Sequence, residues 1–150
     1  WGRCMSSIIR GSDNFDSTPP SHGRVVRTAG TVTTTSTSLV SFTGASITLT
    51  TGANPVAYGV AMVSSNTTAG QNAEYNVSID GTRQLGTTGL AFQQPASSGS
   101  YWLNHSFSGM TSALTAGSHT ILLEWSVTAG TGQAVASSDT SQLFYAHEVK

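Results

Sequence analysis

The sequence is poor in charge and holds a single lysine. Charged residues make up 9% of its 150 residues, the formal net charge is −1, and the only lysine is Lys150. Proteins that bind nucleic acid need clustered Lys and Arg, because much of their affinity comes from counterions released from the phosphates. No such cluster is present, so we expect no nucleic-acid partner.

Cysteine and long apolar runs are also missing. Cys4 is the only cysteine, so the chain cannot form an internal disulfide. No apolar run reaches the ~20 residues that a membrane-spanning helix needs, and we expect no membrane partner. The first residues lack the basic region and apolar core of a signal peptide, and Met5 offers an alternative start to the residues before it.

Catalytic motifs are the third absence. The sequence contains no G-x-S-x-G elbow, H-E-x-x-H pair, phosphate-binding loop or C-x-x-C. Its seven carboxylates are scattered, whereas a glycosidase needs two that converge. Glu74 and Glu124 lie on expected strands, but each falls on the polar face. We therefore expect no enzyme activity and no cofactor.

Serine, threonine and glycine are abundant instead, with 23 Ser, 22 Thr and 16 Gly. Such a composition could indicate disorder, but disordered chains normally combine high charge with few large apolar residues. Here the charge is low, and the hydrophobic residues, at 37%, alternate regularly with polar ones. A threonine-rich β protein fits better, because branched side chains suit pleated strands.

Alternation with a period of two dominates after about residue 24. In AEYNVSID, residues 73–80, Tyr75, Val77 and Ile79 share one face, which is typical of a half-buried antiparallel strand. Asp80-Gly81 follows, a dipeptide favoured in tight hairpin turns. The same pattern predicts strands over residues 100–108, 118–127 and 141–149. In the last of these the expected apolar face is formed by Leu143, Tyr145, His147 and Val149.

The segment VAYGVAMV, residues 56–63, is apolar on both faces. Its larger residues form one face, and Ala57, Gly59 and Ala61 belong to the other. A strand with two apolar faces is typically central in a sheet. The small face predicts a subunit interface, or alternatively a tight place inside the sandwich.

Shorter strands are expected at residues 24–28, 31–36, 38–43, 46–50, 88–93 and 133–137, separated by turns such as Thr43-Gly44. The only helix-like piece, residues 109–117, is short enough to be a loop. Eight to ten strands at this spacing predict an all-β fold, an antiparallel β-sandwich of jelly-roll type. We assign residues 24–150 to the sandwich and residues 1–23 to an extended N-terminal arm.

Three histidines, His105, His119 and His147, fall on expected apolar faces. They could meet around a metal ion or a threefold axis. Such histidines are more often hydrogen-bonded core or interface residues, so we expect no metal site. Asp13, Asn14 and Asp16 lack the spacing of a calcium loop and indicate a local Asx turn.

Exposed aromatic residues are candidates for ligand contact. Trp102 lies opposite the Tyr101/Leu103 face, beside the loop PASSGS. Amphipathic rings suit both sugar faces and protein interfaces, so Trp102 and Tyr101 could bind a glycan or pack against another subunit. Three N-x-S/T sequons, at Asn66, Asn76 and Asn104, are close to the number expected by chance in so Ser/Thr-rich a chain.

Two stretches resemble known proteins. SIIRGSDNFDS, residues 7–17, resembles an N-terminal stretch of small tailed-phage virion proteins of the fibre- or tail-related or capsid-decoration type. LTAGSHTILLEWSV, residues 114–127, resembles the penultimate-strand region of tumour-necrosis-factor-like and complement-type jelly rolls. The residues that match are Leu114, Gly117, His119, Leu123 and Trp125. The resemblance implies a homotrimer within a virion, with capsid or tail/baseplate subunits as partners, and it implies no active site.

The arm then has an expected role. A virion protein must attach to a larger lattice, and a short arm with apolar anchors can become ordered by docking on a neighbour. Ile8, Ile9 and Phe15 would be the anchors, and Pro19-Pro20 would stiffen the exit toward the sandwich. The alternative is a merely frayed terminus.

Together these features predict a non-enzymatic bacteriophage structural protein located in the virion, an extracellular particle. It would be a homotrimer that is either associated with the tail or fibre, where its loops could contact a host surface glycan, or bound to the capsid as a decoration. The alternative from a different class is a secreted bacterial carbohydrate-binding module.

Overall fold

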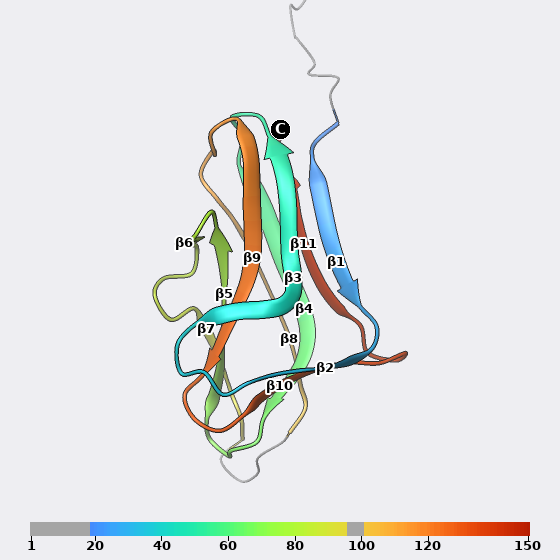
Figure 1. Ribbon diagram of the computed structural model, residues 1–150, viewed down its shortest axis with the longest axis vertical. Coiled ribbons are helices and arrows are strands. Elements are labelled where there is room, and N and C mark those ends of the chain that lie inside the picture. Colours follow the sequence, from blue (N-terminus) through green and yellow to red (C-terminus); the bar gives the residue numbers. More distant parts are fainter. Residues whose placement is uncertain (1–18, 96–100) are drawn as a thin grey trace, which may run out of the picture.

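The computed structural model describes residues 19–95 and 101–150, and this part of the chain is built from strands and loops without a helix (Figure 1). Accordingly, no helix of the described residues could cross a membrane. The expected anchors Ile8, Ile9 and Phe15 lie outside the described residues.

The strands are β1 His22–Arg27, β2 Gly30–Thr34, β3 Val40–Thr51, β4 Val56–Asn66, β5 Asn72–Ile79, β6 Thr82–Arg83, β7 Leu90–Gln93, β8 Leu103–Met110, β9 Gly117–Val127, β10 Gly132–Ala136 and β11 Gln142–Glu148.

The strands form two antiparallel sheets that pack face to face. Sheet A has the order β1-β11-β4-β10-β2, with β8 also paired to β4, and sheet B has the order β3-β9-β5-β6, with β7 also paired to β5. From β3 to β5 and from β8 to β10, consecutive strands alternate between the sheets. The predicted antiparallel β-sandwich of jelly-roll type is therefore confirmed.

Strand β4 is central, as its two apolar faces predicted. One edge pairs with β11 as far as Ala61 and with β10 from Val63 onward, and the other edge pairs with β8. Its larger residues, Val56, Tyr58, Val60 and Met62, are buried in the core. Its smaller residues face away from the core, so the small face lies on the outside of the sandwich rather than inside it.

Strand β3 corrects the prediction of two strands separated by a turn at Thr43-Gly44. The chain stays extended from Val40 to Thr51, and the pairing with β9 shifts register between Ser41 and Ser46. A bulge of this kind lets a strand bend without ending. Figure 1 shows β3 turning sharply in its course across sheet B.

The predicted hairpin at Asp80-Gly81 is confirmed. Ile79 pairs with Thr82, and the two turn residues have φ values of 50° and 81°. Positive φ at both central positions is the geometry that Asp-Gly adopts readily in a two-residue turn.

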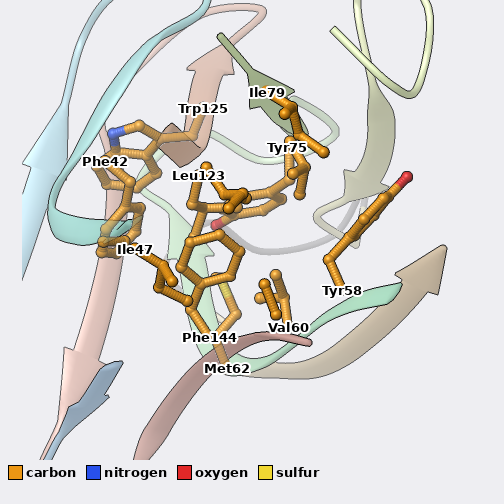
Figure 2. Packing of buried hydrophobic residues seen from close by; sticks show 14 of the residues in the cluster. Phe42, Ile47, Tyr58, Val60, Met62, Tyr75, Ile79, Leu123, Trp125 and Phe144 are labelled. Atoms are coloured by element: carbon orange, nitrogen blue, oxygen red, sulfur yellow. The ribbon is translucent and has the colours of Figure 1, made fainter. Parts of the chain in front are cut away.

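The core lies between the sheets and is organised around Trp125 and Tyr75 (Figure 2). The two side chains are 1% and 0% exposed, which confirms the faces predicted for β9 and β5. The ring centroid of Trp125 lies 4.8 Å from that of Phe42 and 6.2 Å from that of Tyr75. Burial of such large rings supplies much of the hydrophobic stabilisation of a chain without disulfides.

Strand β11 corrects a second prediction, because its faces are reversed. Phe144 and Ala146 are buried with Gln142 and Glu148, whereas His147 is exposed and Leu143 and Tyr145 are half-buried. Both faces of this segment carry large apolar residues, so alternation alone could not choose between them. The carboxylate of Glu148 accepts hydrogen bonds from Gly52 N and Asn54 Nδ2, and Gln142 Oε1 accepts one from Arg27 Nη1, whereas Gln142 Nε2 has no partner.

Candidate functional site

The outward-facing residues of β1, β11, β4 and β8 form a surface that we call the neutral face. The strand registers align His147, Ala57 and Met110 in one row, Tyr145, Gly59 and Ser108 in the next, and Leu143, Ala61 and Ser106 in a third. The face is completed by His22, Arg24, Val26, Val63 and Asn104. Arg24 is its only residue with a permanent charge.

Tyr145 lies across the middle of this face. A Cβ atom placed on Gly59 would lie 2.5 Å from two ring carbons and from the hydroxyl oxygen of Tyr145, so the ring rests directly on the Gly59 backbone. The same ring stacks on His147, with centroids 6.2 Å apart and planes inclined by 16°. Of the predicted interface residues, Gly59 is therefore buried by its own chain, and Ala57 and Ala61 remain half-buried beside it.

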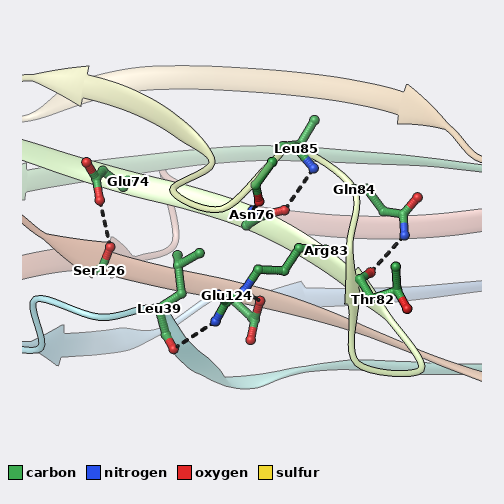
Figure 3. Close-up of polar contacts among 10 residues, drawn as sticks. Leu39, Glu74, Asn76, Thr82, Arg83, Gln84, Leu85, Glu124 and Ser126 are labelled. Carbon is green, nitrogen blue, oxygen red and sulfur yellow. Dashed lines mark hydrogen bonds and ion pairs between the residues drawn. The ribbon is translucent and has the colours of Figure 1, made fainter.

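The outer face of sheet B differs in character (Figure 3). Arg83 Nε lies 2.9 Å from Glu124 Oε2, and Ser126 Oγ donates to Glu74 Oε2 at 2.9 Å. Hydroxyl side chains such as Thr48 and Thr120 point outward on the neighbouring strands. This face is polar and charged, as a solvent-facing sheet surface normally is.

Glu74 and Glu124, the two carboxylates considered as a catalytic pair, thus both lie on the polar outer face of sheet B. Glu74 and Glu124 sit on neighbouring strands, offset by two residues, because Glu74 pairs with Ser126 and Asn76 with Glu124. Arg83 occupies one oxygen of Glu124 and Ser126 occupies one of Glu74. A proton donor and a nucleophile for glycoside hydrolysis need free carboxyl groups on either side of a substrate, and this arrangement provides structural pairing instead.

The three histidines do not meet. His105 and His119 are buried as predicted, but His147 is exposed on the outer side of β11, which reverses its predicted placement. Within residues 19–95 and 101–150, no group of three His, Cys, Asp or Glu side chains could hold a metal ion.

His105 belongs to a polar chain inside the core. The Tyr75 hydroxyl donates to Ser64 Oγ at 2.7 Å, and Ser64 Oγ lies 2.6 Å from His105 Nε2. The ring stacks on Phe92 with centroids 4.2 Å apart, and its Nδ1 has no hydrogen-bond partner. Burial lowers the pKa of His105 to about 4, so the ring is neutral at physiological pH.

A serine within hydrogen-bond reach of a histidine can be the start of a nucleophile and base arrangement. Ser64 is 1% exposed, so no substrate can reach its hydroxyl. His105 Nδ1 also lacks the acceptor that orients the base in such systems. The pair therefore acts as a core polar contact.

His119 is held by two acceptors. Its Nδ1 lies 2.6 Å from Asp80 Oδ2 and its Nε2 lies 2.8 Å from the Thr115 carbonyl oxygen. Only the doubly protonated ring can donate from both nitrogens. The hydrogen bond to Asp80, followed by that to Thr115, raises the pKa of His119, and the same pairing with His119 lowers the pKa of Asp80.

At the end of the sandwich where β1 begins, Glu148 forms a cluster that we call the Glu148 clasp. Its carboxylate accepts from Gly52 N at 2.7 Å, Asn54 Nδ2 at 2.8 Å and Ser21 N at 3.3 Å. The Ser21 hydroxyl also donates to the Thr50 carbonyl oxygen. The bond from Asn54, ahead of the others, lowers the pKa of Glu148. The clasp ties the entrance of β1 to β11 and to the β3–β4 loop.

Two of the three sequons have structural explanations. Asn66 Nδ2 donates to the Asn72 and Ala129 carbonyl oxygens, and Asn76 Nδ2 donates to the Gly86 carbonyl oxygen. Both asparagines are 0% exposed, so a glycan could not be attached to them in the folded protein. Their side chains stabilise loops.

The predicted ligand-contact residues, Tyr101 and Trp102, are exposed ahead of β8. The Tyr101 backbone is fixed by the Gln94 side chain, which donates to its carbonyl oxygen at 2.7 Å. Neither aromatic residue is among those that line a groove of about 560 Å³ on the nearby part of the neutral face. Sequence reasoning missed this groove because its wall, the turn between β10 and β11, comes from a distant part of the chain.

Comparisons with known proteins give likenesses of fold. No family model matches the sequence, and no curated protein matches it significantly. A chain of the infectious bursal disease virus (IBDV) T13 particle has 11% identity and a TM-score of 0.44, over 86% of this chain and 35% of its own. A chain of the T=1 particles derived from that virus has 11% identity and a TM-score of 0.43, over 86% and 36%. Dimeric latent PorU from Porphyromonas gingivalis has 10% identity and a TM-score of 0.42, over 86% and 13%.

The present chain thus spans little more than a third, or less, of the length of these proteins, and no role is transferred from them. Its two antiparallel sheets, with consecutive strands crossing between them, make it a β-sandwich of jelly-roll type.

Proposed function

We propose that the chain is a non-enzymatic structural protein of a bacteriophage particle, and that it assembles with copies of itself through the rows of the neutral face that contain Tyr145 and His147. The observation that carries this proposal is the contrast between the two outer faces of the sandwich. Sheet B presents hydroxyl groups, Glu74, Glu124 and Arg83 to solvent. Sheet A presents small and apolar side chains, a tyrosine and two histidines, with Arg24 as its one permanent charge.

The neutral face suits close packing against another protein surface. Met110 is 62% exposed and Val26 is 46% exposed at its two edges, and small residues lie between them. A contiguous apolar surface rimmed by polar groups is typical of an interaction site. In a closed ring of three copies each contact joins two different patches of neighbouring subunits, so one part of the neutral face would pack against another part of the neutral face of the next copy.

The homotrimer and the virion location draw their support from the sequence. Proteins that residues 114–127 resemble are commonly homotrimers, and residues 7–17 resemble small tailed-phage virion proteins. The arm would bind capsid or tail/baseplate subunits through Ile8, Ile9 and Phe15. Loops at the surface of the particle would contact a host surface glycan.

The test of assembly is to place a charge on the neutral face. Light scattering coupled to size exclusion at micromolar concentration should show trimers for the wild type. Ser108→Arg should give monomers, because the interface would have to bury an unpaired guanidinium. Thr48→Arg on the outer face of sheet B is the matched control and should remain trimeric. A monomeric wild type, or a trimeric Ser108→Arg variant, would contradict the proposal.

A secreted carbohydrate-binding module is the second candidate, favoured by the exposure of Tyr101 and Trp102. Such a module would bind sugar as a monomer, and it would be found free of particles. Mass spectrometry of purified particles separates the two candidates, because only the structural protein would be present at a stoichiometric copy number.

A further inference from the structure

The groove on the neutral face arises from a split in sheet A. Strand β4 pairs with β11 up to Ala61, opposite Leu143, and with β10 from Val63, opposite Val135. Between these pairs, at Met62, the two neighbouring strands part, and the turn that joins them is closed by hydrogen bonds between Ser137 and Thr140. In Figure 1 this turn, in red, projects from the right side of the sandwich.

The turn becomes one wall of the groove, and strands β4 and β8 supply the floor and the other side. Asp139, Thr140 and Ser141 line the wall, and Ala61, Val63, Asn104 and Ser106 line the opposite surface. The volume of about 560 Å³ is within the range of ligand-binding clefts, roughly 300–1,000 Å³. A second hollow of about 320 Å³ adjoins the groove at Ala61 and Ser106, but it is lined by Ser108 and Tyr145 and belongs to the part of the neutral face proposed for assembly.

The lining carries polar groups that the protein itself does not use. In the described part of the chain, the side chains of Asn104, Ser106 and Ser141 have no hydrogen bond to another residue. Asp139 Oδ1 receives only a long bond of 3.4 Å from Ser138 Oγ. The groove therefore offers an amide, two hydroxyls and a carboxylate to a ligand.

The charge of the lining selects the ligand. Asp139 is its only residue with a permanent charge, and no Lys or Arg is among the lining residues. An anionic ligand would meet a carboxylate without a compensating cation. A neutral ligand rich in hydroxyl groups can instead donate to Asp139 and exchange hydrogen bonds with Asn104 and the serines. The methyl groups of Ala61 and Val63 suit the C–H faces of sugar rings.

We propose that this groove, rather than the exposed pair Tyr101 and Trp102, binds a neutral oligosaccharide. The groove lies beside the Leu143 row at one end of the neutral face, so contacts between copies through the rows of His147 and Tyr145 would leave it open. The proposed function includes a contact with a host glycan. This inference names the site of that contact and therefore rests on that part of the proposed function. The site is built from β4, β8 and the β10–β11 turn, with Asp139 and Asn104 as the principal hydrogen-bonding residues.

The test uses the full chain on an array of neutral oligosaccharides of hexose and N-acetylhexosamine units, with sulfated and sialylated oligosaccharides on the same array. We expect binding to one or more neutral members and none to the anionic ones. Asp139→Ala and Asn104→Ala should each weaken the dissociation constant of the best neutral ligand at least fivefold. Ser141→Trp should abolish binding by filling the groove. Ser138→Trp, on the same turn but outside the lining, is the matched control and should bind normally.

Loss of binding on Trp102→Ala with no effect of Ser141→Trp would overturn the proposal, as would preference for anionic sugars or no binding at all. Measuring the oligomeric state of each sample distinguishes a failure of the proposed sugar site from a failure of the proposed assembly. A trimer that binds no sugar would refute the groove alone, and a monomer that binds through Asp139 would refute the assembly alone.

Discussion

The two buried histidines respond to pH in opposite senses because their ring nitrogens have different surroundings. His119 donates to Asp80 and Thr115, which raises its pKa above the usual 6.5, whereas burial lowers the pKa of His105 to about 4. The raised pKa of His119 stabilises the fold by its full amount below pH 6.5. This contribution is lost as the pH rises through the pKa that His119 has in the folded state. A lowered histidine pKa makes stability fall as pH drops from 6.5 toward 4, since the unfolded chain binds the proton more readily.

We therefore predict that the free energy of unfolding is greatest near pH 6.5 and declines on both sides. Denaturant titrations from pH 4.5 to 9 should show this maximum. His119→Gln should flatten the alkaline side and His105→Gln the acid side, whereas His147→Gln, at an exposed position, should change neither. An alkaline decline that persisted in His119→Gln would contradict the assignment.

Among single residues, the alternation in the sequence predicted the burial of some correctly and placed others on the wrong face. Alternation placed Tyr75 and Trp125 in the core because each lies on a strand with one clearly polar face. It misplaced Tyr145 and His147 because the buried face of β11 includes Gln142 and Glu148. Their partners, Arg27 for Gln142 and Gly52 and Asn54 for Glu148, lie 94 or more residues away in sequence. Local patterns cannot show that a distant residue will satisfy a buried polar group.

At the scale of elements, the positions of the strands were largely predictable from the sequence. The places where strands continue, bulge or separate were not. The two apolar faces of residues 56–63 indicated a central strand, and β4 has neighbours on both edges. The continuity of β3 through Thr43-Gly44 was missed because a turn and a bulge favour the same residue types. The split between β10 and β11 at Met62 follows from pairing across sheet A, so the groove had no sequence signal.

The contact between β11 and β4 gives a prediction at this scale. Gly59→Ala should lower the free energy of unfolding by roughly 1–3 kcal/mol, because a Cβ atom would displace the Tyr145 ring from the strand. In a Tyr145→Ser background the same substitution should be neutral or stabilising, since alanine is otherwise better than glycine within a strand. Denaturant unfolding of the four proteins measures the coupling, and equal effects of Gly59→Ala in both backgrounds would show that the ring does not rest there.

For the whole molecule, the energetics of the proposed arm favour attachment through several copies. Burying Ile8, Ile9 and Phe15 would contribute ~2 kcal/mol each, whereas ordering some fifteen residues costs ~1 kcal/mol or more per residue. Side-chain burial alone does not offset this cost. Backbone hydrogen bonds to a partner, or simultaneous docking of the arms of one trimer, must supply the difference.

Deletion of residues 1–20 should therefore leave the sandwich folded and oligomeric but abolish its incorporation into particles. The deletion keeps Ser21 and the whole of β1, so the pairing of β1 with β11 is retained. Circular dichroism and light scattering check the folding and assembly, and quantitative mass spectrometry of purified particles checks the incorporation. Incorporation at full occupancy would show that attachment runs through the sandwich instead.

The Glu148 clasp has a mechanical consequence. The chain enters β1 at the clasp, and β1 then pairs with β11 over six consecutive residues. A pull on the chain ahead of Ser21, directed along β1, would load this ladder in shear, so that its hydrogen bonds and the contacts of Ser21 would have to yield together rather than in succession. Resistance to such a pull is governed by the unfolding rate rather than by equilibrium stability. A particle tethered through this end would transmit tension into sheet A at its edge, through β1 and β11.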